Sequence, residues 1–162
     1  MVGEARRSVQ ALQGNVESGP KVCIAYFYFD FRDHLKRLAQ SMLYSILHQL
    51  AIQSSSFPPS LVDMKKRGVS RDSISLSELT AELIGICANF DHSMLFLDAL
   101  DECQNFAELL KVLKELTGKL PRISLIVSSR DELEIKHGIG PLGFDRFPIS
   151  FCCPNFKSLV LS

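Results

Sequence analysis

The sequence predicts an α/β protein with a parallel sheet between two layers of helices. Three apolar runs, at residues 22–31, 94–97 and 123–127, are too continuous for half-exposed strands and fit strands that are buried on both faces. Amphipathic stretches with apolar residues at three- and four-residue spacing separate these runs. Strands that alternate with helices pair in parallel through right-handed crossovers, so the pattern predicts helices on both faces of the sheet.

Length and composition limit the number of domains and the kinds of partner that the protein can bind. Its 162 residues suffice for one domain, and 46% hydrophobic residues with a mean hydropathy of +0.12 are typical of a globular core. The 18 Lys and Arg residues balance the 18 Asp and Glu residues. Because the net charge is zero, there is no general attraction to nucleic acid or to an anionic membrane. We therefore expect protein partners that are recognised by specific sites.

The cysteines and the N-terminus favour a cytoplasmic location. The odd number of cysteines argues for a reducing compartment, and their spacing fits neither a zinc site nor a disulfide framework: they are Cys23, Cys87, Cys103, Cys152 and Cys153. Cys23 and Cys87 lie in apolar stretches and are expected to act as small core residues. The N-terminus lacks the apolar segment of a signal peptide, and no apolar run reaches the roughly 18 residues that span a bilayer.

The first third of the chain predicts one strand and one long helix. Residues 1–20 are polar, and residues 8–13 have the pattern of a helix end. The first apolar strand follows, and its aromatic and β-branched run predicts a central strand of the sheet. Asp33 is then the expected N-cap of a helix that runs to about Gln53. The buried face of this helix is predicted to carry Leu35, Leu38, Met42, Ile46 and Leu50.

Two further helices flank the second strand. Ser75 and Glu78 match a capping box, and the helix they open has an apolar stripe of Leu76, Leu79, Leu83, Cys87 and Phe90. The second helix is expected to end at Gly118, and its stripe is Phe106, Leu109, Leu110, Leu113 and Leu116. A basic cluster at residues 65–67 is predicted to be solvated surface. Beyond His137, glycines and prolines interrupt any regular pattern, so a tail without a clear element is expected.

An acidic cluster follows the second strand directly. Met94 to Leu97 is apolar, and Asp98, Asp101 and Glu102 come next, in the form of a Walker B segment. Ligands of open α/β sheets bind beyond the carboxyl ends of the strands, where a carboxylate such as Asp98 can hold the Mg²⁺ of a nucleotide. Asp101 or Glu102 would then position or deprotonate the attacking water. The alternative is that Asp98 only caps the next helix and that the other acids are solvated.

Three fragments, in this order along the chain, resemble one known family. They are Ala-Tyr-Phe-Tyr-Phe-Asp-Phe at residues 25–31, Leu-Asp-Ala-Leu-Asp-Glu-Cys at 97–103 and Ile-Val-Ser-Ser-Arg-Asp-Glu at 126–132. Together they resemble the NACHT-type (STAND) NTPase core of fungal NLR-like proteins, which is also described as the nephrocystin-3-like N-terminal domain. The resemblance covers roughly Ser8 to Lys136. It implies a three-layer, P-loop NTPase-like fold.

The resemblance also implies a signal-transduction role and assigns site residues. By matched motif position, Asp98 would be the acid linked to Mg²⁺, and Asp101 with Glu102 would support hydrolysis. Arg130, at the end of the third strand, resembles the family's sensor near the γ-phosphate, and the less favoured alternative is an ordinary surface or strand-end arginine. Asp131 stands where the family usually has proline. The intact family binds Mg-ATP and uses nucleotide exchange as an assembly switch.

The chain departs from the family in its phosphate-binding loop. No Gly-x-x-x-x-Gly-Lys-Ser/Thr sequence is present, and the nearest pair, Gly118-Lys119, is followed by Leu120. We therefore expect an incomplete fold whose residues 1–20 are the remnant of the helix after the missing loop. Residues 21–136 would be a partial core and residues 137–162 a divergent tail. No cofactor-binding residues, and no cofactor for this chain alone, are predicted.

Three functions follow from this pattern. The first is a nucleotide-site-deficient NACHT core without ATPase activity of its own. The second is an interaction or decoy module whose exposed sheet edge pairs with a full-length NLR-like relative through homotypic contacts. The third is an ATP-binding switch whose P-loop comes from another chain or is replaced by the segment Gly138 to Gly143. That segment has no Lys followed by Ser or Thr, which places the third function last.

Overall fold

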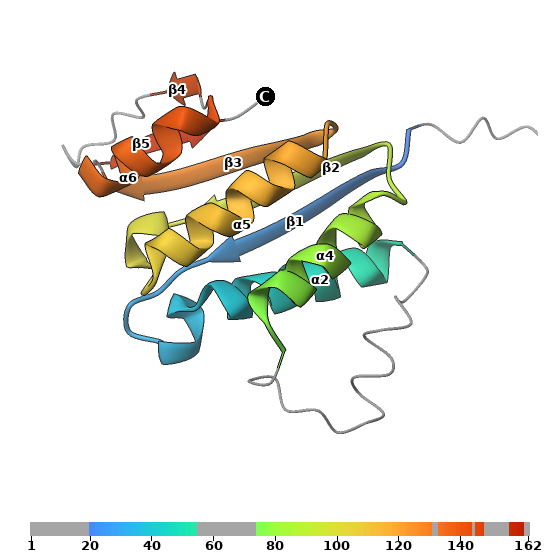
Figure 1. The fold of residues 1–162 in the computed structure, drawn as a ribbon, viewed down its shortest axis with the longest axis horizontal. Coiled ribbons are helices and arrows are strands. Elements are labelled where there is room, and N and C mark those ends of the chain that lie inside the picture. The colour runs from blue at the N-terminus through green and yellow to red at the C-terminus, as the bar shows by residue number, and fades with distance from the viewer. Residues whose placement is uncertain (1–19, 55–73, 131–132, 144, 148–155, 161–162) are drawn as a thin grey trace, which may run out of the picture.

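Three parallel strands form the centre of the molecule (Figure 1). The computed structural model describes the chain at residues 20–54, 74–130, 133–143, 145–147 and 156–160. The parallel strands are β1 (Val22–Tyr28), β2 (His92–Asp98) and β3 (Ile123–Arg130), and β2 lies between the other two. β1 is therefore an edge strand, so the central position predicted for it is wrong. The α/β class and the three parallel strands that the sequence predicts are therefore confirmed.

The sheet continues past β3 with two antiparallel strands, which the sequence does not predict. β5 (Phe156–Val160) pairs with β3, and β4 (Asp145–Phe147) pairs with β5, so the strand order is β1-β2-β3-β5-β4. The expectation of a tail without regular elements is thus wrong for these segments, and the sheet is mixed. Strands of three and five residues are too short for an alternation of apolar and polar residues to be recognised in the sequence. β5 forms because its backbone pairs with the edge of β3 that β2 leaves free.

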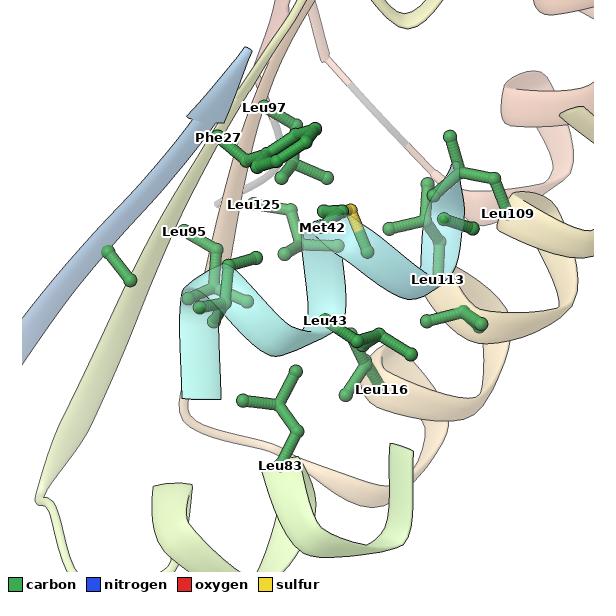
Figure 2. Close-up of a cluster of buried hydrophobic side chains, with 14 of the residues drawn as sticks. Phe27, Met42, Leu43, Leu83, Leu95, Leu97, Leu109, Leu113, Leu116 and Leu125 are labelled. Carbon is green, nitrogen blue, oxygen red and sulfur yellow. The ribbon is translucent and has the colours of Figure 1, made fainter. Parts of the chain in front are cut away.

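One face of the parallel strands carries the hydrophobic core. Side chains of alternate residues point to the same face, and the strand register aligns them in rows. Two rows that run across the sheet are almost completely buried, and they consist of Ala25, Leu95 and Leu125, and of Phe27, Leu97 and Val127. Figure 2 shows four of these strand residues directed at leucines and a methionine from three helices: Phe27, Leu95, Leu97 and Leu125.

The helices that cover this face are amphipathic. They are α2 (Ala39–Gln53), α4 (Leu76–Cys87) and α5 (Phe106–Lys119), and α4 contacts both of the others. Their buried stripes agree with the predicted ones at Met42, Ile46, Leu50, Leu79, Leu83, Leu109, Leu113 and Leu116. In the described parts of the chain, no helix is long and apolar enough to cross a bilayer.

The opposite face of the sheet is open in the described structure, although the sequence predicts helices on both faces. β1 shows this most clearly, because its outward side chains are 46–63% exposed: Val22, Ile24, Tyr26 and Tyr28. The reason lies in the handedness of the connections. β1 to β2 and β2 to β3 move in the same direction across the sheet, and right-handed crossovers that move in one direction place all their helices on one face.

The helix ends show where local signals succeed and where tertiary contacts override them. The capping box of Ser75 and Glu78 is confirmed, with both reciprocal hydrogen bonds present. Asp33 is an N-cap as predicted, but it caps the 3-10 turn η1 (His34–Arg37), and α2 begins only after an extended Leu38. Leu35, predicted to be buried, is consequently 63% exposed.

Contacts with other loops explain the break before α2. The Lys36 carbonyl accepts from the Asp30 amide at 3.3 Å, and the Arg37 carbonyl accepts from the Gln104 amide at 2.8 Å. These bonds hold η1 as a separate turn. At the other end of the chain, Gly118 lies inside α5, whose C-cap is Leu120, so the predicted end at Gly118 is wrong by two residues.

Several predicted features lie outside the described residues. They are the helix end at residues 8–13, the basic cluster at 65–67 and the cysteine pair at 152–153. The other two cysteines that the sequence assigns to the core, Cys23 and Cys87, are buried as predicted. Cys103 is buried as well.

Gly138 in α6 (Leu133–Ile139) permits a close contact with α5, and this predicts a difference between two glycines. A Cβ atom at Gly138 would lie 2.5 Å from Leu110 Cδ1 and 2.9 Å from Phe106 Cε1. We expect Gly138→Ala to be less favourable than Gly85→Ala by about 1–3 kcal/mol in urea unfolding, because the side chains of Leu110 and Phe106 must move to admit the Cβ atom. Gly85→Ala is the matched control, since Gly85 is exposed on α4 with open space around it. It should stabilise by up to about 1 kcal/mol. Equal effects would contradict the packing role.

The buried thiols predict a loss of stability at alkaline pH. Burial raises the pKa of the Cys87 thiol from 9.0 to about 11 and also raises the pKa of Cys23, which donates a hydrogen bond to Ser93 at 3.1 Å. Below pH 9 the thiol is neutral in both states. Between pH 9 and 11 the unfolded chain loses the proton and the folded chain keeps it, so the free energy of unfolding should fall by up to about 2–3 kcal/mol. Cys87→Ala should show a smaller fall in urea unfolding at pH 8 and pH 10.5. An identical pH dependence in both proteins would refute this.

Candidate functional site

The carboxyl ends of the three parallel strands bring the predicted site residues to one edge of the sheet. Asp98 is the last residue of β2 and Arg130 is the last residue of β3. Asp101 and Glu102 lie in the 3-10 turn η3 (Leu100–Glu102), which follows β2 directly. The structure therefore places all four predicted site residues at the ends of two neighbouring strands and in the turn that follows β2.

A left-handed residue directs the chain from β2 toward β3. Ala99 has φ 56° and ψ 51°, and among the described residues it is the only non-glycine with positive φ. This conformation is unfavourable for alanine, and the surroundings must hold it in place. Two contacts do so: the Ala99 amide donates to Ser128 Oγ at 3.2 Å, and the Leu100 side chain is fully buried in the core.

Asp101 is bound on both of its carboxylate oxygens. Arg130 Nε lies 2.7 Å from Asp101 Oδ2, while the Arg130 backbone amide donates to Oδ1 at 3.0 Å. The Ser129 hydroxyl also donates to Oδ1, at 3.2 Å. The Asp101 side chain is only 3% exposed, whereas that of Arg130 is 53% exposed. Asp101 is thus a buried carboxylate whose acceptor positions connect η3 to the end of β3.

Glu102 extends this network to the loop after β1. Glu102 Oε2 accepts from the Phe31 backbone amide at 2.8 Å. Glu102 Oε1 lies 3.4 Å from Arg130 Nη2, in a longer contact than that of Asp101. The Phe29 amide donates to the Asp98 carbonyl at 3.0 Å, which ties the same two segments together through the backbone. The acid–arginine network, by which we mean Asp101, Glu102 and Arg130, therefore joins the ends of all three strands.

Asp98 lies apart from this network, on the open face of the sheet. Its side chain is exposed, and Asp98 Oδ1 accepts a short hydrogen bond from the Ser128 hydroxyl. Ser128 and Ser129 are neighbours in β3, so their side chains point to opposite faces, one toward Asp98 and the other toward Asp101. The two aspartates that the sequence treats as one catalytic cluster are thus bound on different sides of the sheet.

Three charged residues after β1 lie beside this edge, and of these Arg32 is exposed while Asp30 and Lys36 are half-buried. Arg32 pairs with Asp30 through Nε at 3.0 Å, and the hydrogen bonds from Arg32 hold the pKa of the Asp30 carboxyl below its usual value. Lys36 donates a short hydrogen bond to the Tyr28 hydroxyl, which raises the pKa of Lys36, and its Nζ lies 4.0 Å from the Tyr28 ring centroid. Tyr28 is the register partner of Asp98, so the contact between Lys36 and Tyr28 lies beside Asp98 on the open face.

The residues at this edge do not form a magnesium site of their own. Mg²⁺ requires six oxygen ligands in near-octahedral geometry and in nucleotide sites takes several from phosphate and water. Asp98 supplies one carboxylate, one oxygen of which already accepts from Ser128. Asp101 is occupied by Arg130 on both oxygens. Within the described residues, no group of three or more His, Cys, Asp or Glu side chains is arranged to hold a metal ion.

Sequence reasoning missed the two serines and the Phe31 amide that complete the site. The hydroxyls at the end of β3 are visible in the sequence, and their adjacency already requires that they face opposite sides of a strand. That signal shows that the two hydroxyls face different sides, but only the fold shows that Ser128 binds Asp98 and Ser129 binds Asp101. The Phe31 amide carries no sequence signal, because any residue offers a backbone N–H and only the fold selects this one.

The fold and the edge geometry define an α/β domain with a polar network at the carboxyl ends of its parallel strands. A family comparison agrees with the resemblance seen in the sequence, because residues 5–130 match the family described as nephrocystin 3, N-terminal. The chain belongs to this family. The match ends at Arg130, the last residue of β3. Searches of curated proteins and of solved structures gave no match.

The network predicts that Arg130 contributes to stability. In Arg130→Ala the buried Asp101 carboxylate loses its ionic partner, so we expect a loss of about 1–3 kcal/mol in urea unfolding, below the range for fully buried pairs because Arg130 is half-exposed. Lys119→Ala is the control, since it removes an exposed pair with Glu115 at 2.7 Å. It should cost about 0.5 kcal/mol or less. Adding Asp101→Asn to Arg130→Ala should restore part of the loss. No difference between Arg130→Ala and the control would rule out this role.

Proposed function

We propose that this chain is a NACHT-type, P-loop NTPase-like domain that does not hydrolyse ATP by itself and acts through contacts with other proteins. One observation carries the proposal: Asp101 and Glu102 are both engaged by Arg130 and by backbone amides. In the intact family, the equivalents of these acids and of Arg130 would act on the nucleotide. Here the three residues bind one another and hold the strand ends together.

The contacts of the two acids make them poor water activators. A general base must reach the proton it removes, directly or through one water. The Asp101 side chain is 3% exposed and both of its oxygens accept hydrogen bonds or ion-pair contacts. The Glu102 side chain is 18% exposed, with one oxygen on the Phe31 amide and the other near Arg130. For either acid to activate a water molecule, its contacts with Arg130 and the backbone amides would first have to break.

The substitute phosphate loop is not favoured either. Gly138 lies in α6, where its missing side chain admits Leu110 and Phe106 of α5. Gly140–Leu142 forms the 3-10 turn η4, and Gly143 caps it in a left-handed conformation with φ 76°. These glycines therefore have roles in helix packing and turn formation. An ATP-binding switch would therefore need a phosphate loop other than the segment Gly138 to Gly143.

Nucleotide binding gives the direct test of this proposal. A ligand at ~100 times its dissociation constant adds about 2.7 kcal/mol to stability, which moves the melting midpoint of a domain this size by several degrees. We expect millimolar Mg-ATP to leave the midpoint unchanged and to remain unhydrolysed, and we expect Asp98→Asn to give the same result. A reproducible rise in the midpoint that Asp98→Asn abolishes would overturn the proposal in favour of an ATP-binding switch.

The open sheet face favours a second candidate function, a homotypic interaction module. Val22, Ile24, Tyr26 and Tyr28 present a β-branched and aromatic surface that no described helix covers. We infer that another domain of the same family is the partner. Two sheets pack face to face at about 10 Å through such side chains, and the zero net charge of the chain opposes contact between copies only weakly. This differs from the sequence-based hypothesis, which assigns the contact to an exposed sheet edge.

Self-association measured by analytical ultracentrifugation tests the second function. Ile24→Lys places a charge in the centre of the open face and should weaken self-association at least about tenfold, or 1.4 kcal/mol. Leu133→Lys is the matched control, because Leu133 is 70% exposed on α6, away from this face. It should leave association unchanged. If the two variants behave alike, the open face is not the contact surface.

A further inference from the structure

β1 is an edge strand whose free hydrogen-bonding groups are occupied by two glutamine side chains. The Gln53 amide binds both backbone groups of Ile24: Oε1 accepts from the Ile24 amide at 3.0 Å, and Nε2 donates to the Ile24 carbonyl at 2.7 Å. Gln49 binds Tyr26 with the same pair of hydrogen bonds. Gln49 Oε1 accepts from the Tyr26 amide at 3.1 Å, and Nε2 donates to the Tyr26 carbonyl at 2.8 Å. We call Gln49 and Gln53 the glutamine clamp.

The clamp satisfies the groups that a neighbouring strand would otherwise bind. β1 pairs with β2 on one side only, and alternate residues direct their amide and carbonyl groups to the other side. Ile24 and Tyr26 are residues of this outward set. A row of such groups is a template for pairing with another chain. Each glutamine offers one donor and one acceptor, as a paired strand does, so the clamp imitates a strand at this edge.

The spacing of the two glutamines along α2 matches the spacing of Ile24 and Tyr26 along β1. Gln49 and Gln53 are four residues apart in α2, which corresponds to about 6.0 Å along a helix. Ile24 and Tyr26 are two residues apart, which corresponds to about 6.6 Å along a strand. Gln53 Nε2 also donates to the Gln49 carbonyl at 3.1 Å, and Gln49 Nε2 to Ser45 Oγ at 3.2 Å. These additional bonds orient both amides toward β1, beside which α2 runs in Figure 1.

We propose that the outer edge of β1 is a strand-pairing site for β1 of a second copy of this chain, and that the glutamine clamp holds it closed. The clamp bonds are accessible to water, since Gln53 is exposed and Gln49 is half-exposed. Strand pairing at this edge requires these two side chains to leave the backbone groups of Ile24 and Tyr26. The proposal goes beyond both proposed functions, because it concerns the edge of the sheet and neither its carboxyl end nor its open face.

The residues of β1 are self-complementary in an antiparallel pair. A two-fold axis beside Ala25 places Ile24 opposite Tyr26 of the second copy and Val22 opposite Tyr28. In such a hydrogen-bonded pair, the amide of each residue donates to the carbonyl of the other. Ile24 and Tyr26, which bind the clamp within one copy, would thus bind each other between two copies. Every cross-strand pair on the open face then joins a β-branched residue to an aromatic one, which is a favoured combination.

Amide hydrogen exchange at Ile24 and Tyr26 tests the proposal. In the wild-type chain the clamp should protect both amides at every protein concentration. In Gln49→Ala/Gln53→Ala, exchange in dilute solution should be at least about tenfold faster. Protection should return when the concentration rises about a hundredfold, because the two edges then pair. His48→Ala, an exposed position on the same helix, is the control and should behave as the wild type.

Two outcomes would overturn the proposal. If both amides stay protected in the dilute double variant, the clamp does not close the edge. If protection does not return at high concentration, β1 does not pair with itself, even when the chain associates through its open face, since face-to-face contact leaves the edge groups free. Should the double variant fail to fold, Gln53→Ala alone exposes Ile24 and must show the same concentration-dependent protection at that amide.

Discussion

The shared direction of the two crossovers is the constraint on which the rest of the structure depends. Because β1, β2 and β3 follow one another across the sheet and each connection is right-handed, α2, α4 and α5 are all placed on one face. The other face of β1 remains open in the described structure, and β1 itself becomes an edge. The open face and the glutamine clamp are both consequences of this arrangement.

The same constraint brings the strand ends together, and there the charged residues act as connectors. Asp101 and Glu102 bind Arg130 and the Phe31 amide, so these contacts join the loop after β1, the turn after β2 and the end of β3. The left-handed Ala99 makes this possible by turning η3 toward β3. An acidic sequence that has the form of a catalytic motif therefore has an alternative physical use, in which its charges neutralise an arginine at the rim of the sheet.

Much of the fold and part of the site could be predicted from local patterns. The parallel strands, the stripes of α4 and α5, and the capping box depend on periodicity or on neighbours within four residues. The grouping of Asp98, Asp101, Glu102 and Arg130 at one edge followed from strand order. The separation of Asp98 from Asp101 could not be predicted, because it depends on which serine of β3 each aspartate binds. The short strands β4 and β5 carry no period long enough to detect.

The sequence by itself determined the α/β class, the three parallel strands and the position of the acids and Arg130 at the strand ends, because hydrophobic periodicity and capping chemistry act over a few residues. Tertiary structure alone decided which face is covered, how the sheet extends past β3, and which partners the charged groups have. It also decided that Gln49 and Gln53 bind the edge of β1. These choices depend on backbone groups that every residue carries, and only the folded chain selects among them.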